Sequence, residues 1–447
     1  MKKESSFFKT VCALAIPVTL QSMLQTSFSM VDQVMIGQLG SVNVAGVGFA
    51  GKFASVYSVV ISAISAVAGI MISQYLGQKN RQEVRRSFFT NLWISGGIAL
   101  IFTVLCVLFA EPVMGLYTKD FGTKQVAAAY LVLMAGTFLP MAGATLLSTM
   151  FRCMEKPKYP LYVSFAAAAL NTGLNYVLIF GKLGFSPMGA RGAAIATVIS
   201  QWTNLLLMVW IMKGQWKNLI KQKGDFGTAT KWNWPQYFSI LLPMLVCEVL
   251  WSLGENVYAV IYGHIGTDAG AAMMLTNPIQ GLVIGALCGL SQAAGIIVGK
   301  KLGSEEYDGA YEASKKLILY GAAGAVILSA AVILTGAWYV DIYQVEETVK
   351  ELTRQILLAY ALVAPFKVLN MILGGGIIRS GGCTKLVMYI DMIGTWCVGV
   401  PLGFLAAFVF KLAIPYVYFI LSLEECVRFG ISLVVLRKKE WMKRLEG

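Results

Sequence analysis

The stretch Pro243–Gly266, PMLVCEVLWSLGENVYAVIYGHIG, decides the fold of this chain because it repeats an earlier stretch. Pro17–Gly40, PVTLQSMLQTSFSMVDQVMIGQLG, aligns with it without a gap at an offset of 226 residues. The same offset relates Ser65–Gly77 to Ser291–Gly303, and an offset of 227 relates Arg152 to Arg379. Three segments in step indicate an internal duplication, which sets the architecture.

The composition is that of a membrane protein. Of the 447 residues, 57% are hydrophobic and only 13% are charged. Soluble globular chains contain about 45–50% apolar and about 25% charged residues, so no soluble fold could bury this much apolar surface. The sequence therefore predicts an all-α polytopic membrane protein.

A membrane-spanning helix needs about 20 apolar residues, and twelve segments of the chain meet this requirement. They are residues 11–36, 47–73, 88–110, 126–150, 161–181, 191–212, 237–263, 272–299, 315–338, 354–378, 386–410 and 412–436. The polar gap 213–236 lies between the two copies and is expected to link them. We expect two six-helix lobes around a central cavity, residues 1–222 and 223–447, related by a pseudo-twofold axis along the membrane normal.

The basic residues predict the orientation. The net charge is +13, and 26 of the 36 Lys and Arg residues lie in loops on the side of both termini, against 7 on the opposite side. Basic loops stay in the cytoplasm, so we expect a multi-pass protein of the cell membrane with both termini cytoplasmic. The same charges would contact anionic lipids, and their distribution argues against nucleic-acid binding.

Eight ionisable residues are expected to be buried within the predicted spans, where charges are costly and usually functional. They are Asp32, Glu248, Glu255, Asp391, Glu424, Glu425, Lys367 and Arg428. Glu424 and Arg428 are spaced as an intrahelical ion pair, which favours a structural role. Lys367 is either a counter-ion for a carboxylate or a residue that extends its amine toward the membrane surface.

Glu248 and Glu255 are seven residues apart, so they share one helix face with Trp251 and Tyr258 close by. Carboxylates beside aromatic rings suit organic cations, through charge and cation–π attraction. We predict a substrate site formed by Glu248, Glu255, Trp251, Tyr258 and Asp391. The alternatives are a structural hydrogen bond for Glu248, solvation for Glu255 and an interfacial position beside Lys385 for Asp391.

Asp32 is the candidate ion-coupling residue. Burial raises the pKa of a carboxylate and cation binding lowers it, so one such group can exchange H⁺ or Na⁺. Asn171 and Asn175, one helical turn apart, are predicted to supply uncharged oxygens to the same cavity, which makes Asp32 a candidate Na⁺ site. The alternative is an interfacial carboxylate that pairs with Lys52 or with a lipid headgroup.

Other chemistry is not indicated. The eight cysteines are scattered and there is one histidine, so we expect neither a metal cluster nor a disulfide framework. We find no nucleophile–base pair typical of a hydrolase, so we expect a protein that is not an enzyme and needs no cofactor. The glycines at 374–376 and 381–382 indicate close helix contact or a hinge.

Several segments, in this order, resemble the multidrug and toxic compound extrusion family along nearly the whole chain. They are VDQVMIGQLG (31–40), AGIMISQYLG (68–77), GARGAAIATVIS (189–200), EVLW (248–251), IYGHIG (261–266), QAAGIIVGKKLG (292–303) and IIRSGGCTK (377–385). The resemblance implies two lobes with alternating access and antiport of drugs against H⁺ or Na⁺. Asp32 matches the family's helix-1 aspartate, whereas Asn175 stands where many relatives have an aspartate.

The resulting expectation is a cation-coupled antiporter that exports small amphipathic, cationic drugs or metabolites, and that functions as a monomer. The alternative is a flippase for lipid-linked precursors with the same fold, which would need arginines for a pyrophosphate group. The candidate cavity residues are mainly acids, which favours the exporter. The sequence leaves open the substrate, the coupling ion and the roles of Lys367 and of the Glu424/Arg428 pair.

Overall fold

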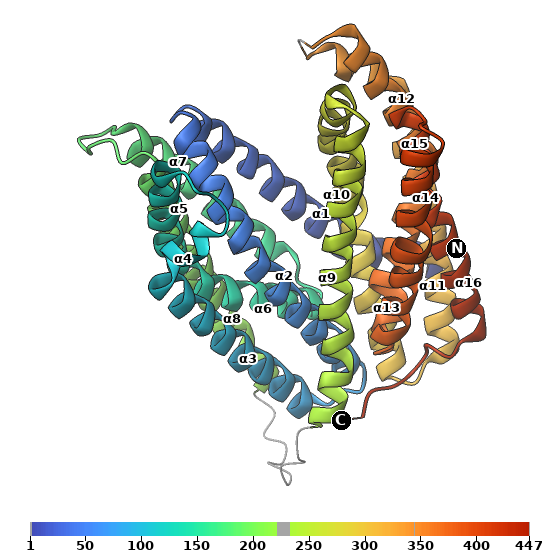
Figure 1. Ribbon diagram of the computed structural model, residues 1–447. Helices are drawn as coiled ribbons and strands as arrows, with labels where there is room; N and C mark the ends of the chain where they lie inside the picture. The colour runs from blue at the N-terminus through green and yellow to red at the C-terminus, as the bar shows by residue number, and fades with distance from the viewer. Residues whose placement is uncertain (1, 221–232, 344, 447) are drawn as a thin grey trace. The chain divides into compact units, whose positions relative to one another are not determined.

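A computed structural model describes residues 2–220, 233–343 and 345–446, and every regular element among them is a helix (Figure 1). In chain order these are α1 (Lys2–Gly37), α2 (Ser41–Gly77), α3 (Arg81–Leu108), α4 (Ala110–Gly115), α5 (Phe121–Met134), η1 (Ala135–Thr137), α6 (Phe138–Cys153), α7 (Lys158–Phe180), α8 (Ala190–Ile220), α9 (Trp234–Ile265), α10 (Thr267–Gly303), α11 (Tyr307–Asp341), α12 (Glu347–Asn370), η2 (Met371–Ile378), α13 (Thr384–Met392), η3 (Ile393–Gly399), α14 (Val400–Phe404), η4 (Leu405–Val409), α15 (Ile414–Ser422) and α16 (Glu424–Lys438). The predicted all-α polytopic fold is confirmed.

The predicted spans coincide with these helices, with one difference. Among the described residues, eleven helical segments are long and apolar enough to cross a membrane. The twelfth predicted span, 412–436, is divided into α15 and α16 at Leu423. The amide of Cys426 donates to the Leu423 carbonyl over 3.0 Å, a bond from residue i+3 to residue i that tightens the chain where Glu424 and Glu425 begin α16.

Polar residues begin several helices where the chain turns back. The side chains of Asn80, Asp120 and Asn233 accept hydrogen bonds from backbone amides three residues later, at 3.2, 2.7 and 3.1 Å. These bonds satisfy amides that have no partner within the first turn of a helix. These three caps mark where α3, α5 and α9 begin.

Prolines inside the spans free backbone carbonyls, and other side chains bind them. Pro140 lacks the amide hydrogen that would bond to the Gly136 carbonyl, and the Trp202 indole donates to that oxygen at 3.1 Å. The short 3₁₀ turn η1 lies at this point and joins α5 to α6. Such substitutes allow a helix with an interior proline to remain in an apolar environment.

The chain forms two compact units. One contains Leu20–Ile72 and Asn80–Lys231, and the other contains Met1–Thr19, Ser73–Lys79 and Trp232–Gly447. We call them the N-unit and the C-unit. The start of α1 and the end of α2 thus belong to the C-unit. Half of the predicted linker, residues 221–232, lies outside the described residues. Its first part, 213–220, continues α8, and its last residues, 234–236, begin α9.

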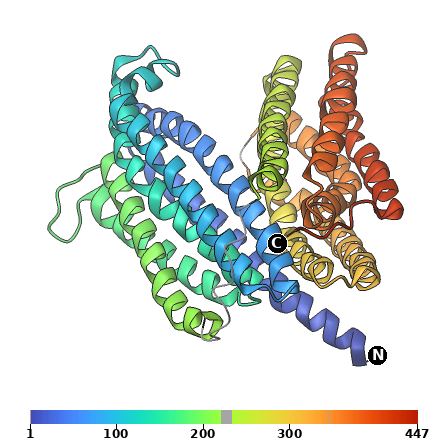
Figure 2. The same ribbon diagram turned by 90° about the horizontal axis from the view of Figure 1, so that it is seen from below.

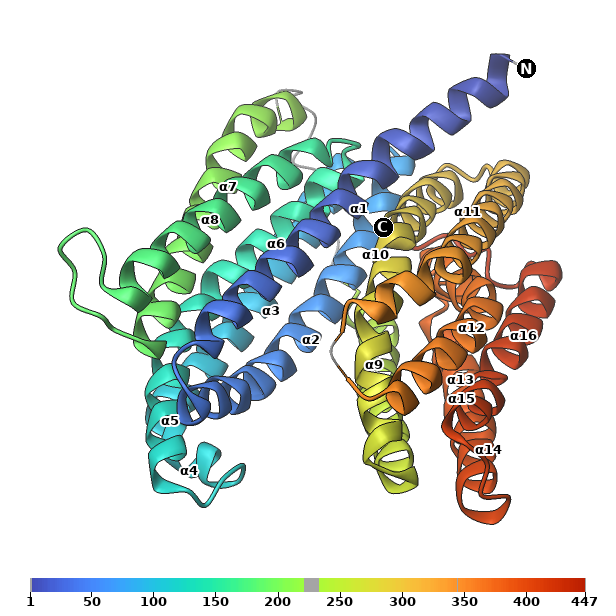
Figure 3. The same ribbon diagram turned by 90° about the horizontal axis from the view of Figure 1, so that it is seen from above.

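Each unit is a bundle of long helices. In the N-unit, α7 packs along α8, and α6 contacts both α3 and α8, as Figure 3 shows. In the C-unit, α10, α11 and α12 pack together and α13 runs beside α9; these are among the lime-green to red helices of Figure 2. The largest side chains fully buried in the N-unit include Tyr57, Phe138 and Phe151, and Tyr57 donates to the Phe138 carbonyl at 2.6 Å.

Residues related by the internal repeat meet where α2 and α10 contact each other within the C-unit. A Cβ atom on Gly77 would collide with the Lys300 carbonyl, and one on Gly303 would collide with the Gln74 carbonyl. Gly77 and Gly303 are repeat partners, as are Gln74 and Lys300, so the contact is reciprocal. The duplication seen in the sequence is therefore also a symmetry of helix packing.

The glycines at 374–376 and 381–382 were predicted to allow close helix contact or to form a hinge, and one of them does lie at a close contact. A Cβ on Gly376 would lie 2.5 Å from the Ser291 carbonyl and 3.0 Å from the Ala294 Cβ, so η2 and α10 approach through the missing side chain. Gly382 has a φ of +74°, which a residue with a side chain rarely adopts. These glycines provide close contact and a turn at the end of η2.

Candidate functional site

The N-unit brings together the three predicted ion-coupling residues. The Asn175 amide donates to the Asp32 carboxylate at 2.6 Å and to the Asn171 side-chain oxygen at 3.2 Å. Asn171 in turn donates to the Thr197 hydroxyl of α8 at 3.4 Å. Asn175 is 1% exposed and Asp32 is half-buried, so this polar cluster is enclosed by α1, α7 and α8.

This cluster offers several oxygen atoms of the kind that hard cations prefer: a carboxylate, two amide carbonyls and a hydroxyl. Asn171 and Asn175 are one turn apart, so both side-chain amides lie on one face of α7, the face that contacts Asp32 through Asn175. Within the described part of the chain there is no group of three or more His, Cys, Asp or Glu side chains that could hold a metal ion.

In the C-unit, Glu248 lies beside a basic residue. One Arg379 nitrogen is 3.8 Å from the Glu248 carboxylate, and another donates to the Cys247 sulfur at 3.5 Å. The Cys247 thiol donates to the Asp391 carboxylate at 2.9 Å. The N-unit contains the repeat equivalent, because Arg152 donates to Gln21 at 3.3 Å, and these two residues are the partners of Arg379 and Cys247.

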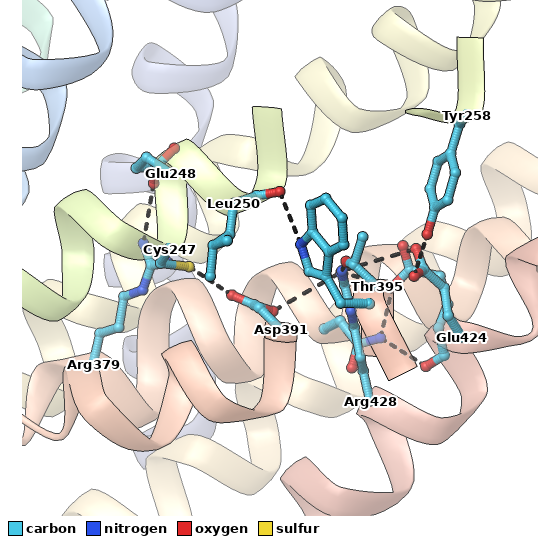
Figure 4. Close-up of polar contacts among 12 residues, drawn as sticks. Cys247, Glu248, Leu250, Tyr258, Arg379, Asp391, Thr395, Glu424 and Arg428 are labelled. Carbon is cyan, nitrogen blue, oxygen red and sulfur yellow. Dashed lines mark hydrogen bonds and ion pairs between the residues drawn. The ribbon is translucent and has the colours of Figure 1, made fainter. Parts of the chain in front are cut away.

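Arg428 of α16 lies among three carboxylates, as Figure 4 shows for two of them. Its guanidinium nitrogens are 3.9 Å from Asp391, 3.8 Å from Glu424 and 3.8 Å from Glu425. Arg428 also donates to the Thr395 hydroxyl. The spacing of Glu424 and Arg428 predicted their ion pair, which is confirmed, and the structure adds two further acidic partners.

A chain of polar contacts thus crosses the C-unit from Arg379 to Tyr258 (Figure 4). It passes through Asp391 and Arg428 to Glu424, which accepts a hydrogen bond of 2.6 Å from the Tyr258 hydroxyl. Each carboxylate in this chain is close to an arginine. Pairing of this kind makes charges tolerable inside a membrane protein.

Next to this chain is a cavity of about 50 Å³, enough for one or two water molecules. It is lined by polar groups from five helices: Glu255, Tyr258, Tyr262, Gln280, Tyr360, Lys367, Tyr418, Ser422, Glu424 and Glu425, with Met273, Val363, Ala364 and Leu421. Lys367 interacts electrostatically with Glu425, Glu255 and Glu424. It forms no ion pair shorter than 4 Å with any described residue.

The predicted substrate residues are therefore divided between two environments. Glu255 and Tyr258 line the cavity, whereas Glu248 and Asp391 belong to the arginine-paired chain. Trp251 is 50% exposed and is not among the cavity-lining residues of the described chain. For Asp391 the alternative was an interfacial position beside Lys385, and in the structure its contacts are with Arg428 and Cys247.

Sequence reasoning missed some of the residues that complete this site. Arg379 was counted as a loop charge, but it is half-buried beside Glu248. Tyr360, Tyr418 and Gln280 carried no sequence signal, because single polar residues on apolar helices cannot be assigned to a shared cavity without tertiary contacts. The repeat offered one indication, since Arg379 occupies the position of Arg152.

Comparison with known proteins identifies a family whose model matches most of this chain. The family model described as MatE matches residues 17–177 and 243–405, two segments separated by the same offset as the internal repeat. A relative from Pasteurella multocida, described as a probable multidrug resistance protein NorM, is 27% identical over 414 residues and covers 89% of this chain and 86% of its own. An uncharacterized transporter of Bacillus subtilis, YisQ, is 22% identical and covers 99% of this chain and 97% of its own.

Solved structures share the fold. The Vibrio cholerae MATE transporter VcmN in its bent form aligns with a TM-score of 0.87 at 18% identity over 98% of both chains. A Pyrococcus furiosus transporter, whose binding pocket is described as having reverse polarity, aligns with a TM-score of 0.84 at 14% identity, covering 96% of this chain and 95% of its own. At these identities the likeness establishes the fold.

Proposed function

This chain belongs to the MatE family of membrane transporters, and from that premise we propose that it is a cation-coupled antiporter that exports small amphipathic, cationic compounds. The coupling ion is H⁺ or Na⁺, and the substrates are drugs or metabolites. Relatives described as probable multidrug resistance proteins support the substrate class. The function is transport, not catalysis.

The observation that carries the proposal is the cluster at Asp32. A half-buried carboxylate held by an amide inside the N-unit can exchange that amide for a proton or a cation. Ion binding neutralises Asp32 and thereby shifts the balance between two helix packings. An ion and a substrate that bind different states of the same protein are coupled through this balance.

The C-unit supports a cationic substrate. Asp391, Glu255, Glu424 and Glu425 outnumber the two basic residues near them, Lys367 and Arg428. Tyrosine rings around these carboxylates add faces on which an organic cation can lie. The 50 Å³ cavity is too small for a drug-sized molecule, so in this conformation its acids attract a substrate by charge and do not enclose it.

The test is efflux of a fluorescent cationic dye from proteoliposomes with H⁺ and Na⁺ gradients imposed separately. We expect Asp32→Asn to retain the fold and to lose gradient-driven efflux, because an amide cannot exchange an ion. Asp120→Asn is the matched control, since this exposed carboxylate only caps α5 and asparagine caps a helix equally well. Unchanged coupled efflux in Asp32→Asn would refute the role of this carboxylate.

The flippase alternative receives less support from the geometry. It needs unpaired arginines for a pyrophosphate group, but Arg379 and Arg428 each lie against carboxylates. Transport of a labelled lipid-linked pyrophosphate by the purified protein, without dye efflux, would favour it. The other proposed features are a monomer in the cell membrane, both termini in the cytoplasm and lobes that divide near residue 222.

A further inference from the structure

After α16 the chain does not end freely but runs along the ends of other helices in the C-unit (Figure 1). We call this segment, Lys439–Glu446, the strap. Lys439 adopts a φ of +60°, which ends α16 and turns the chain away from its axis. The strap then contacts the end of α2, which comes from the first half of the sequence.

The contacts between the strap and the end of α2 are made by side-chain amides and by the Tyr75 hydroxyl, which donates to the Glu446 carbonyl at 3.1 Å. The Gln74 side chain accepts from the Leu445 amide at 2.7 Å, and donates to the Lys443 carbonyl at 3.1 Å and to the Ser380 carbonyl at 2.7 Å. Gln78 donates to the Leu445 carbonyl at 2.9 Å. Gln74 in the last turn of α2 and Gln78 just after its end therefore supply hydrogen-bond partners for the backbone of the strap.

The strap is anchored to its own unit at both ends. Trp441 is 0% exposed and its indole donates to the Leu436 carbonyl at 3.3 Å. Its carbonyl oxygen lies where a Cβ of Gly381 would stand, so only glycine permits this contact. At the other end, Arg444 forms an ion pair with Glu305, between α10 and α11.

These contacts matter because α2 is divided between the two units. Its residues up to Ile72 group with the N-unit, whereas Ser73–Lys79 group with the C-unit. A transporter that alternates between two states must rearrange its halves, and a helix shared by both units restrains that movement. The bonds to Gln74 and Gln78 are few and polar, so they can break and re-form at a modest free-energy cost.

We propose that the strap, Lys439–Glu446, is a conformational latch that holds the end of α2 in the C-unit and must release it during each transport cycle. The latch acts through Gln74 and Gln78, and Trp441 keeps the strap in place when α2 leaves. This inference goes beyond the proposed antiport activity and can fail independently of it.

The first test is hydrogen–deuterium exchange of the purified protein truncated after Met442, which retains the Trp441 anchor. We expect amides near Ser73–Lys79 to exchange several-fold faster, while those of α11 and α12 keep their rates. Lys443→Ala is the matched control, because it retains the backbone carbonyl that Gln74 binds. Unchanged exchange at Ser73–Lys79 in the truncated protein would overturn the latch, whether or not dye is transported.

The second test keeps the whole chain and closes the latch permanently. Gln78→Cys and Glu446→Cys are joined by a short thiol-reactive cross-linker, and dye efflux is measured before and after reductive cleavage. We expect cross-linking to reduce efflux to background, and cleavage to restore the rate that the double variant had before cross-linking. The single variant Glu446→Cys, which keeps the backbone carbonyl that Tyr75 binds, should transport at the full rate. A cross-linked protein that transports at the full rate would show that α2 need not leave the strap.

Discussion

Lys367 is a residue whose surroundings only the structure shows. Its sequence context left open a counter-ion or a residue reaching toward the membrane surface, and it lines a cavity with Glu255, Glu424 and Glu425. The positive charges near these three carboxylates are the Lys367 ammonium and the guanidinium of Arg428, which Asp391 also contacts. A positive charge fixed at this point opposes the binding of every further cation nearby.

We therefore predict that Lys367→Met lowers the KM for cationic dyes, and more for a dication than for a monocation. The expected gain is about 2 kcal/mol per unit of substrate charge for a cation about 8 Å from the amine, at an effective dielectric constant near 20. Efflux kinetics with a matched pair of dyes would measure it, and Lys367→Arg, which keeps the charge, should show no such trend. An equal change in KM for both dyes would mean that Lys367 acts by packing and not by charge.

Arg428 shows how charged residues can be accommodated in these helices. It lies within 4 Å of Asp391, Glu424 and Glu425, so one guanidinium reduces the repulsion among three carboxylates. The i, i+4 spacing identified one partner in advance. Asp391 is on a different helix, and no spacing rule reaches across elements.

At the scale of elements, glycine at a contact point determines how closely two helices approach. Gly376 in η2 faces the Ser291 carbonyl of α10, whereas Gly374, one half-turn earlier, meets only a Val387 methyl at 3.5 Å. The two residues lie in the same irregular helix and differ mainly in this contact. The comparison isolates the effect of close packing.

We predict that Gly376→Ala destabilises the protein by about 1–3 kcal/mol, because α10 and η2 must separate to admit a methyl group. Gly374→Ala should cost much less, since ordinary van der Waals space is available. Thermal unfolding in detergent, followed by fluorescence, measures both variants. Equal losses would indicate that helix propensity in η2, and not contact with α10, controls stability.

The division of the twelfth predicted span also belongs to this scale. Apolar composition suggested one helix over 412–436, but the chain breaks at Leu423. Glu424, Glu425 and Arg428 follow this junction, and their partners lie inside the C-unit. Hydropathy counts residues without regard to the face they occupy, so it could not locate this break.

For the whole molecule, the duplication predicts that repeat partners behave alike. Gly77 and Gly303 each leave room for a backbone carbonyl of the other helix, at Lys300 and Gln74 respectively. The contact is therefore a small symmetric unit made from both halves of the sequence. Its energetic symmetry can be measured.

We expect Gly77→Ala and Gly303→Ala to lower the thermal unfolding midpoint by similar amounts, since each forces the same two helices apart. Gly37→Ala and Gly263→Ala are matched controls from the same repeat, because no atom lies within 4 Å of an added methyl at either position. Midpoints measured under one set of detergent conditions would compare all four. A large effect at only one of the contact glycines would contradict the symmetry.

The sequence alone determined the placement of the first eleven predicted spans, the duplication and the family resemblance, because these depend on apolar length and on periodic matches along the chain. It also grouped Asp32 with Asn171 and Asn175, which the structure places in one hydrogen-bonded cluster. The tertiary structure alone decided which acids are paired with arginine, which line the cavity, and that the strap reaches α2. These features are contacts between residues far apart in the chain, and their free energy depends on distance in space, which spacing along a helix does not encode.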